Sequence, residues 1–208
     1  MEIKFYGGNC IKITSKKNSI VVDDSSKIGL KSIVTDKDIY LLTDKRVADR
    51  ADKAYFSIDS PGEYEVADVS IHGVPARAHI DMEKTSNATM YRVIVDDVRI
   101  AIVGHIHPDL TEDQLEDLGT IDVLIVPIGG NGYTLDGVGA QKVIRKIEPK
   151  VIIPTHYDNK SLNFEVPQAS LTDALSALAM EPAETLDSFK IKNGDVGEGP
   201  RLIVLNQS

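Results

Sequence analysis

The sequence predicts an α+β fold, an αββα sandwich in which two mixed β-sheets pack face to face and helices lie outside them. Two observations predict this fold class. The first half of the chain is rich in short strands joined by tight turns, and the second half alternates apolar strands with helices. The 208 residues suffice for a substantial core, and we find no linker, low-complexity tract or short-period repeat. We therefore expect one domain that spans residues 1–208.

The strands of the first half are indicated by short apolar or alternating runs between turn residues. Asp96-Asp97 separates the last two runs and is a hairpin signal. The charged segment 44–50 is expected to form a short helix or a loop. The predicted strands, of which the first three make a β-meander, lie at residues 3–6, 10–14, 20–22, 39–42, 54–58, 64–66, 69–74, 90–95 and 98–103.

Three apolar runs organise the second half, at residues 100–103, 123–126 and 151–153. Each is short, β-branched and free of charge, which suits a strand that is buried on both faces. Between the second and third runs, apolar residues recur at helical spacing from Ala140 to Ile147. Strand, loop, helix and strand in this order form a crossover unit.

Two further helices and two closing strands complete the chain. Thr111 and Ser170 are good N-cap residues, and each precedes a segment with helical character. The predicted helices span residues 111–118 and 170–180, and the closing strands span 189–191 and 202–205 across a Gly-rich turn at 193–199.

Charge and composition exclude several classes of function. Lys and Arg number 23 and Asp and Glu number 32, so the net charge is −9 and nucleic-acid binding is not expected. The single cysteine, Cys10, excludes a disulfide framework and a multi-cysteine zinc site, and a reducing cytoplasmic location follows as the default. The N-terminus is predicted to be a strand rather than a signal peptide. No apolar run approaches the ~18 residues of a membrane span, so we expect a small-molecule partner and no membrane partner.

Histidines follow two of the three buried strands. His105 and His107 come after the first strand, and His156 comes after the third. Polar groups at the ends of adjacent strands converge in such folds. The sequence therefore predicts a functional pocket at these strand ends.

Several short motifs, taken in order, resemble the metallo-β-lactamase-fold hydrolases, in the branch that includes sugar-lactone hydrolases. The resemblance covers nearly the whole chain and implies the αββα fold. Gly8 stands where the family usually has a histidine, whereas His79 and His156 stand at positions of family metal ligands. The matching segments are residues 6–10, 21–23, 61–64, 74–76 ahead of His79, 126–130 with Thr134, and 153–157.

The chain departs from the family at its main metal motif, His-x-His-x-Asp-His. Asp44 and Arg46 stand at the two first histidine positions, Ala48 at the aspartate position, and Asp49 at the last histidine position. The family's bridging aspartate falls at His105. The resemblance therefore does not imply a dinuclear site in this chain.

A reduced metal site is what the resemblance leaves. His79, His105 and His156 stand where three ligands are expected to converge, and three imidazoles with an open position are a known catalytic zinc arrangement. We expect at most one ion, zinc or else iron or manganese, which lowers the pKa of bound water to ~7. His107 is an alternative to His105, because the two residues would face the same side of an extended backbone.

Acidic and basic residues near the lost motif are expected to tune this site. Asp24, Asp44 and Asp49 could supply a carboxylate ligand or orient an imidazole, although Asp44 and Asp49 could equally cap a helix. Arg46 places a positive charge near the expected metal position. The side chain either turns outward or stands in for the cation and pairs with Asp24, Asp49 or an anionic ligand.

Three hypotheses for function follow. The first is a divergent metal-dependent hydrolase with a reduced site of at most one ion, acting on an ester, lactone, amide or phosphoester. The alternative is a metal-free binding or scaffold protein that retains the fold. A third is a metal-free pocket in which Arg46 and the histidines bind an anionic metabolite. Because members of the family are often oligomers, a homo-oligomer is also an expectation from the resemblance.

Overall fold

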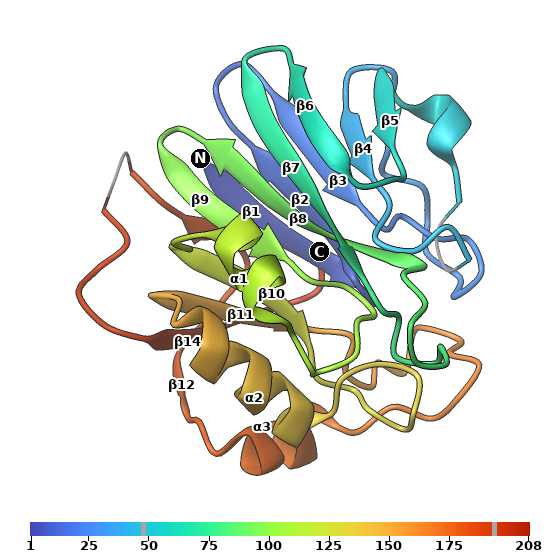
Figure 1. Ribbon diagram of the computed structural model, residues 1–208, viewed down its shortest axis with the longest axis vertical. Coiled ribbons are helices and arrows are strands. Elements are labelled where there is room, and N and C mark those ends of the chain that lie inside the picture. The colour runs from blue at the N-terminus through green and yellow to red at the C-terminus, as the bar shows by residue number, and fades with distance from the viewer. Residues whose placement is uncertain (47–48, 193–194) are drawn as a thin grey trace.

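The computed structural model describes residues 1–46, 49–192 and 195–208, and it confirms the predicted pair of mixed sheets packed face to face (Figure 1). Within these residues one sheet has the strand order β13-β1-β2-β3-β4-β5. The other has the order β12-β14-β11-β10-β9-β8-β7-β6. We refer to them as the six-stranded and the eight-stranded sheet.

The six-stranded sheet begins with the predicted meander. Its first three strands pair antiparallel, and β4 and β5 then join in parallel. Residues of β1 alternate between buried and half-buried, because one face of the strand points into the core. The strands are β1 (Glu2–Gly7), β2 (Cys10–Thr14), β3 (Ser19–Val22), β4 (Ile39–Leu41), β5 (Phe56–Ile58) and β13 (Phe189–Lys190).

The eight-stranded sheet is antiparallel from β6 to β9 and parallel from β9 to β12. Every residue of β10 and β11 is buried, as expected for strands covered on both faces. The strands are β6 (Gly62–Val66), β7 (Val69–Ala76), β8 (Ala88–Val95), β9 (Val98–Ile102), β10 (Val123–Pro127), β11 (Val151–Thr155), β12 (Pro182–Leu186) and β14 (Arg201–Leu205).

β12 lies at the edge of the eight-stranded sheet and was not among the predicted strands. The strand begins with Pro182 and includes Ala183 and Glu184, residue types that are depleted in strands. None of its residues is buried. An edge strand pairs on one side only and tolerates proline at its start, so backbone pairing with β14 sets it without a hydrophobic pattern.

In the described part of the chain, the helices α1, α2 and α3 lie together over the outer face of the eight-stranded sheet (Figure 1). Thr111 and Ser170 cap α1 and α3 as predicted, and α1 has a complete capping box with Gln114. The helix α3 ends earlier than predicted, because Ala179 takes a left-handed conformation. The helices are α1 (Glu112–Leu118), α2 (Gly137–Ile147) and α3 (Leu171–Leu178).

Loops cover the outer face of the six-stranded sheet in the described part of the chain. Tyr40 and Val21 are fully buried there under Leu30 and Val34, which belong to the loop between β3 and β4. Of the predicted segment 44–50, residues 47 and 48 lie outside the described residues, and the rest forms turn and loop. A short 3₁₀-helix, η1 (Ala51–Lys53), follows it.

The main cluster of buried side chains runs through both sheets, and we propose on this ground that residues 1–208 form one domain. Among the described residues, the helices are all too short or too polar to cross a membrane. The first two residues of the predicted turn 193–199 lie outside the described residues.

Candidate functional site

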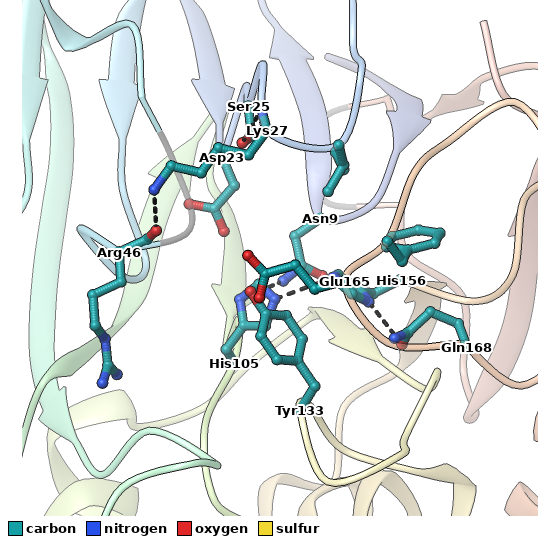
Figure 2. Close-up of a pocket in the computed structure, with 12 residues that line it drawn as sticks. Asn9, Asp23, Ser25, Lys27, Arg46, His105, Tyr133, His156, Glu165 and Gln168 are labelled. Atoms are coloured by element: carbon teal, nitrogen blue, oxygen red, sulfur yellow. Dashed lines mark hydrogen bonds between the residues drawn. The ribbon is translucent and has the colours of Figure 1, made fainter.

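A small cavity lies where several strands end (Figure 2). His105 follows β9, Tyr133 lies in the loop after β10, and His156 follows β11. Asn9 and Asp23 enter from the six-stranded sheet. The cavity volume is about 40 Å³, which admits a few water molecules or one small ion beside a reacting group. The predicted pocket at the strand ends is therefore present.

His105 and His156 lie side by side in this cavity, and we call them the histidine pair. Their Nε2 atoms are 3.1 Å apart, and the two residues are 5% and 2% exposed. Close approaches between backbone segments support this arrangement. A Cβ on Gly104 would lie 2.3 Å from Thr43, and the His156 amide donates to the carbonyl of Gly8. Glycine at position 104 therefore lets the segment before His105 approach Thr43.

Two side-chain amides hold the outer nitrogens of the histidine pair. Asn9 Nδ2 lies 3.1 Å from His105 Nδ1, and Gln168 Oε1 lies 3.1 Å from His156 Nδ1. An amide nitrogen donates, so His105 Nδ1 accepts and His105 carries its proton on Nε2. That proton is donated to His156 Nε2, and His156 Nδ1–H is donated to Gln168. All four ring nitrogens are therefore paired.

Both imidazoles are neutral at ordinary pH. Burial lowers the pKa of His156 to about 4. Burial, together with the neighbouring His156, holds the pKa of His105 well below its ordinary value. Tyr133 packs edge-on against His105, and Phe164 packs against His156. These rings exclude water from the pair and maintain the low polarity that disfavours the imidazolium form.

Asp23 brings a carboxyl group into the same cavity. Its oxygens accept from the amide and the hydroxyl of Thr43, at 2.9 and 2.5 Å. Burial nevertheless raises the pKa of Asp23 to about 7. A carboxyl group with this pKa exchanges its proton near neutral pH, which is the property of a general acid or base.

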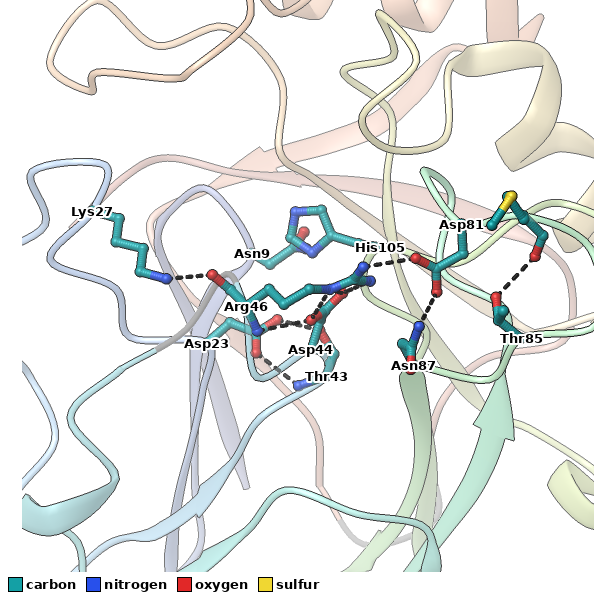
Figure 3. A network of polar contacts seen from close by, with 11 residues as sticks. Asn9, Asp23, Lys27, Thr43, Asp44, Arg46, Asp81, Thr85, Asn87 and His105 are labelled. Atoms are coloured by element: carbon teal, nitrogen blue, oxygen red, sulfur yellow. Dashed lines mark hydrogen bonds and ion pairs between the residues drawn. The ribbon is translucent and has the colours of Figure 1, made fainter.

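Arg46 forms a network at the edge of the cavity (Figure 3). Its Nε and Nη2 donate to Asp44 at 2.6–3.1 Å, and its Nη1 donates to Asp81 at 2.7 Å. Asp81 also accepts from Asn87. These contacts raise the pKa of Arg46, first through the hydrogen bonds to Asp44. The expected partners of Arg46 were Asp24, Asp49 or an anion, and its partners are instead two buried carboxylates.

His79 stands apart from the histidine pair. Its amide donates to the carbonyl of His105 at 2.7 Å, so the two backbones are adjacent. The His79 ring, however, lies against His107 with centroids 5.9 Å apart, and its Nδ1 is 3.3 Å from the carbonyl of Ile106. His107 in turn lies 3.4 Å from Asp109. The predicted convergence of His79 with His105 and His156 is not present in this geometry, and His107 does not replace His105 in the cavity.

The remaining predicted residues serve the surrounding loops. Asp24 is fully buried on the other side of β3, where it pairs with Arg50 and accepts from the amides of Ile33 and Val34. Asp49 accepts from the amide and hydroxyl of Ser26. Neither carboxylate lines the cavity. Ala48, at the family's aspartate position, lies outside the described residues.

Sequence reasoning missed Asn9, Gln168 and Asp81. Asn9 lies inside the family-like segment 6–10, and this segment is the signal that could have placed Asn9 near the strand-end histidines. Gln168 and Asp81 lie in irregular segments, and the sequence contains no periodic signal for either.

The histidine pair fits one metal ion as two of its ligands. Neighbouring nitrogens of a tetrahedral zinc site with Zn–N distances of about 2.0–2.1 Å lie about 3.3 Å apart. The Nε2 separation of 3.1 Å is close to this value. His156 Nδ1 donates to Gln168, as the outer nitrogen of a ligating histidine does, whereas His105 Nδ1 accepts from Asn9 and would serve as a ligand only in its other tautomer. In the described part of the chain, no group of three or more His, Cys, Asp or Glu side chains converges to hold a metal.

The two mixed sheets packed face to face, with a histidine-lined cavity at their strand ends, define a metallo-β-lactamase-type fold. The chain belongs to the β-lactamase superfamily, because the family model "Beta-lactamase superfamily domain" matches residues 2–156, about three quarters of the chain. This match confirms the resemblance drawn from the sequence motifs.

Two curated relatives illustrate the similarity in sequence. A protein of Archaeoglobus fulgidus described as a UPF0173 metal-dependent hydrolase is 28% identical over 120 residues, which are 54% of this chain and 52% of that relative. A UPF0173 protein of Pyrococcus abyssi is 24% identical over 187 residues, 76% of this chain and 83% of the relative. The first match thus spans about half the length of the relative.

Solved structures agree with the fold. The crystal structure of a proposed Zn-dependent hydrolase of the metallo-β-lactamase superfamily from Thermotoga maritima superposes with a TM-score of 0.78 at 26% identity and covers 99% of this chain and 98% of that one. A proposed metal-dependent hydrolase of Parabacteroides distasonis has a TM-score of 0.63 at 19% identity, with 98% and 93% coverage, and supports the fold alone.

Proposed function

We propose that this protein is a metal-dependent hydrolase of the β-lactamase superfamily with a reduced site that holds one ion at the histidine pair. The observation that carries the proposal is the pair itself: two buried imidazoles with Nε2 atoms 3.1 Å apart and with each Nδ1 held by an amide. The descriptions of the archaeal and Thermotoga relatives as metal-dependent or Zn-dependent support the choice of cofactor. Zinc suits imidazole ligands, and iron and manganese are the alternatives.

The side chains of this cavity have separate tasks in the proposed reaction. His105 and His156 would hold the ion, which would supply Lewis-acid activation of water near neutral pH. Asn9 and Gln168 fix the planes of the two rings. Asp23 can hold or release a proton near pH 7 and so can protonate a leaving group.

The size and lining of the cavity restrict the substrate. A volume of about 40 Å³ admits the scissile group while the rest of the substrate stays outside. Lys27, Arg46 and Glu165 are further charged residues of the lining, and the guanidinium of Arg46 is already paired with Asp44 and Asp81. We propose a small molecule with an ester, lactone, amide or phosphoester bond. A homo-oligomer stays a prediction.

A metal-free binding or scaffold protein is the second candidate function. The observation that favours it is that the four ring nitrogens of the histidine pair are all hydrogen-bonded without an ion. In this state the pair offers no lone pair to a substrate and cannot act as a general base. The third hypothesis, an anion bound by Arg46, is weakened because Asp44 and Asp81 already accept the hydrogen bonds of the guanidinium.

The test is turnover over a panel of lactones, aryl esters, amides and phosphoesters, with protein freed of metal and then supplied with zinc, iron or manganese. The proposal predicts hydrolysis that depends on added metal and that His156→Ala abolishes. His72→Ala is the matched control, because His72 lies in β7, outside the cavity lining. Equal turnover in His156→Ala, or no metal-dependent turnover of any class, would count against the proposal and favour the metal-free candidate.

A further inference from the structure

The two amides that contact the histidine pair differ in how firmly they are held. Gln168 Nε2 donates to the backbone carbonyl of Val166 at 2.9 Å, which fixes Oε1 toward His156. Asn9 Oδ1 instead accepts from the hydroxyl of Thr155 at 2.9 Å. A carbonyl only accepts, whereas a hydroxyl can donate or accept. The side-chain amide of Asn9 can therefore exchange the positions of its oxygen and nitrogen and still hydrogen-bond to Thr155. The amide of Gln168 cannot do so, because its oxygen would then face the carbonyl of Val166.

This difference matters because a metal ion needs a lone pair on both Nε2 atoms. His156 already presents one, since its proton lies on Nδ1, against Gln168. His105 does not, because the Asn9 amide nitrogen faces His105 Nδ1 and leaves the proton on Nε2. That proton is donated to His156 Nε2. We call this hydrogen-bonded arrangement the closed form of the histidine pair, and the arrangement with two free Nε2 lone pairs the open form.

We infer that Asn9 is a positioning residue that sets the tautomer of His105 and thereby decides whether the histidine pair is closed or open to a cation. In the open form Asn9 Oδ1 accepts from His105 Nδ1–H, and the Thr155 hydroxyl accepts from Asn9 Nδ2. The closed form pairs all four ring nitrogens without an ion, whereas the open form leaves both Nε2 lone pairs for a cation. Asn9 keeps a partner on each side in both forms, and Asn9 and Thr155 are buried, so water does not compete for these bonds. The metal half of this inference rests on the proposed function; the tautomer half does not.

Asn9→Asp is the variant that separates the two forms. A carboxylate cannot donate to His105 Nδ1, so the ring must place its proton there and present a bare Nε2. The two Nε2 lone pairs then face each other at about the present 3.1 Å, and a cation between them is favoured. Gln168→Glu is the control for charge, because it adds the same charge at the same 3.1 Å distance from His156, whose tautomer already suits an ion. The variant also gives up the donation from Gln168 Nε2 to Val166, so urea unfolding of both variants accompanies the comparison.

The experiment uses the full chain, labelled with ¹⁵N and freed of metal, at pH 8. Two-bond ¹H–¹⁵N spectra identify the protonated nitrogen of each imidazole, and a titration with zinc gives the dissociation constant. We expect the His105 proton on Nε2 in the wild type and in Gln168→Glu, and on Nδ1 in Asn9→Asp. We expect zinc to bind Asn9→Asp about 10–100-fold more tightly than the wild type, and Gln168→Glu to gain less.

Three results would overturn the inference: a wild-type His105 protonated on Nδ1, an unchanged tautomer in Asn9→Asp, or an equal gain of zinc affinity in Gln168→Glu, which would indicate charge alone. A switched tautomer in Asn9→Asp with no zinc bound by any of the three proteins would support the role of Asn9 and refute the proposed metal function. The two failures are therefore distinguishable.

Discussion

Replacing Asp23 by asparagine should stabilise the protein, and the gain should grow with pH. Burial raises the pKa of this carboxyl group from 3.8 to about 7. In the folded state it stays neutral up to pH 7, whereas in the unfolded chain it ionises near pH 4. The stability that the neutral group contributes is thus complete below pH 4 and is lost as pH rises through 7. Asparagine carries no such dependence and can keep both contacts with Thr43.

The size of the effect follows from the shift. About three pH units at about 1.4 kcal/mol each give a difference of roughly 4 kcal/mol between pH 4 and pH 8. Asparagine also suits the backbone, because residue 23 has a φ of 45°, in the left-handed region. Urea unfolding of the wild type and Asp23→Asn at pH 4, 5, 6, 7 and 8 measures the growth of the difference directly.

Asp122→Asn is a control of opposite sign. Asp122 is also buried, yet Arg99 outweighs the effect of that burial and lowers the pKa of the Asp122 carboxyl group. Its ionised form therefore stabilises the fold, and the loss in Asp122→Asn should be largest at neutral pH and fade toward low pH. A pH-independent difference for Asp23→Asn, or a loss that grows with pH, would refute the reasoning about Asp23.

Three further predictions concern the site and its supports. His156→Gln should flatten the acid side of the stability profile, because the wild type loses stability as pH falls from 6.5 to about 4, where the unfolded chain binds a proton that the buried ring excludes. Arg50→Met should cost about 3 kcal/mol in urea unfolding, since it leaves the fully buried Asp24 without its cation. Gly129→Ala should cost about 2–3 kcal/mol or more and weaken zinc binding, because its Cβ would lie 1.9 Å from the His156 carbonyl oxygen and 2.3 Å from Gln168.

Each of these predictions has its own control. Asp122 keeps Lys150 at 3.4 Å when Arg99 is removed, so Arg99→Met should cost less than Arg50→Met; equal costs would argue against a special role for the Arg50 pair. A Cβ on Gly199 meets nothing within 4 Å, so Gly199→Ala should be nearly neutral, and a similar loss in both glycine variants would contradict the close approach at Gly129. If the free energy of unfolding of His156→Gln falls below pH 6.5 as steeply as that of the wild type, groups other than His156 cause the loss of stability in acid.

Much of the fold could be predicted because its elements leave local patterns. The runs that became β9, β10 and β11 are apolar and β-branched, and Thr111 and Ser170 are N-cap residues next to helical periodicity. β12 left no such pattern, since pairing with β14 alone defines it. Periodicity reveals elements that bury a face, and it does not reveal an exposed edge strand.

The candidate site was predictable only in part. His105 and His156 meet because β9 and β11 flank β10 in a parallel sheet, so their carboxyl ends share one edge. The direction of the His79 ring depends on the loop that pairs with the segment after β9, and spacing along the chain does not encode it. Similarly, the left-handed conformation of Asp23 breaks the alternation along β3, so that Asp23 rather than Asp24 lines the cavity.

The central claim is that the histidine pair holds one ion, and native mass spectrometry of the untagged chain after equilibration with zinc tests it most directly. We expect one zinc per chain, lost in His105→Ala and in His156→Ala and retained in His79→Ala. Two zinc ions per chain, zinc retained in His156→Ala, or no zinc on the wild type would contradict the claim.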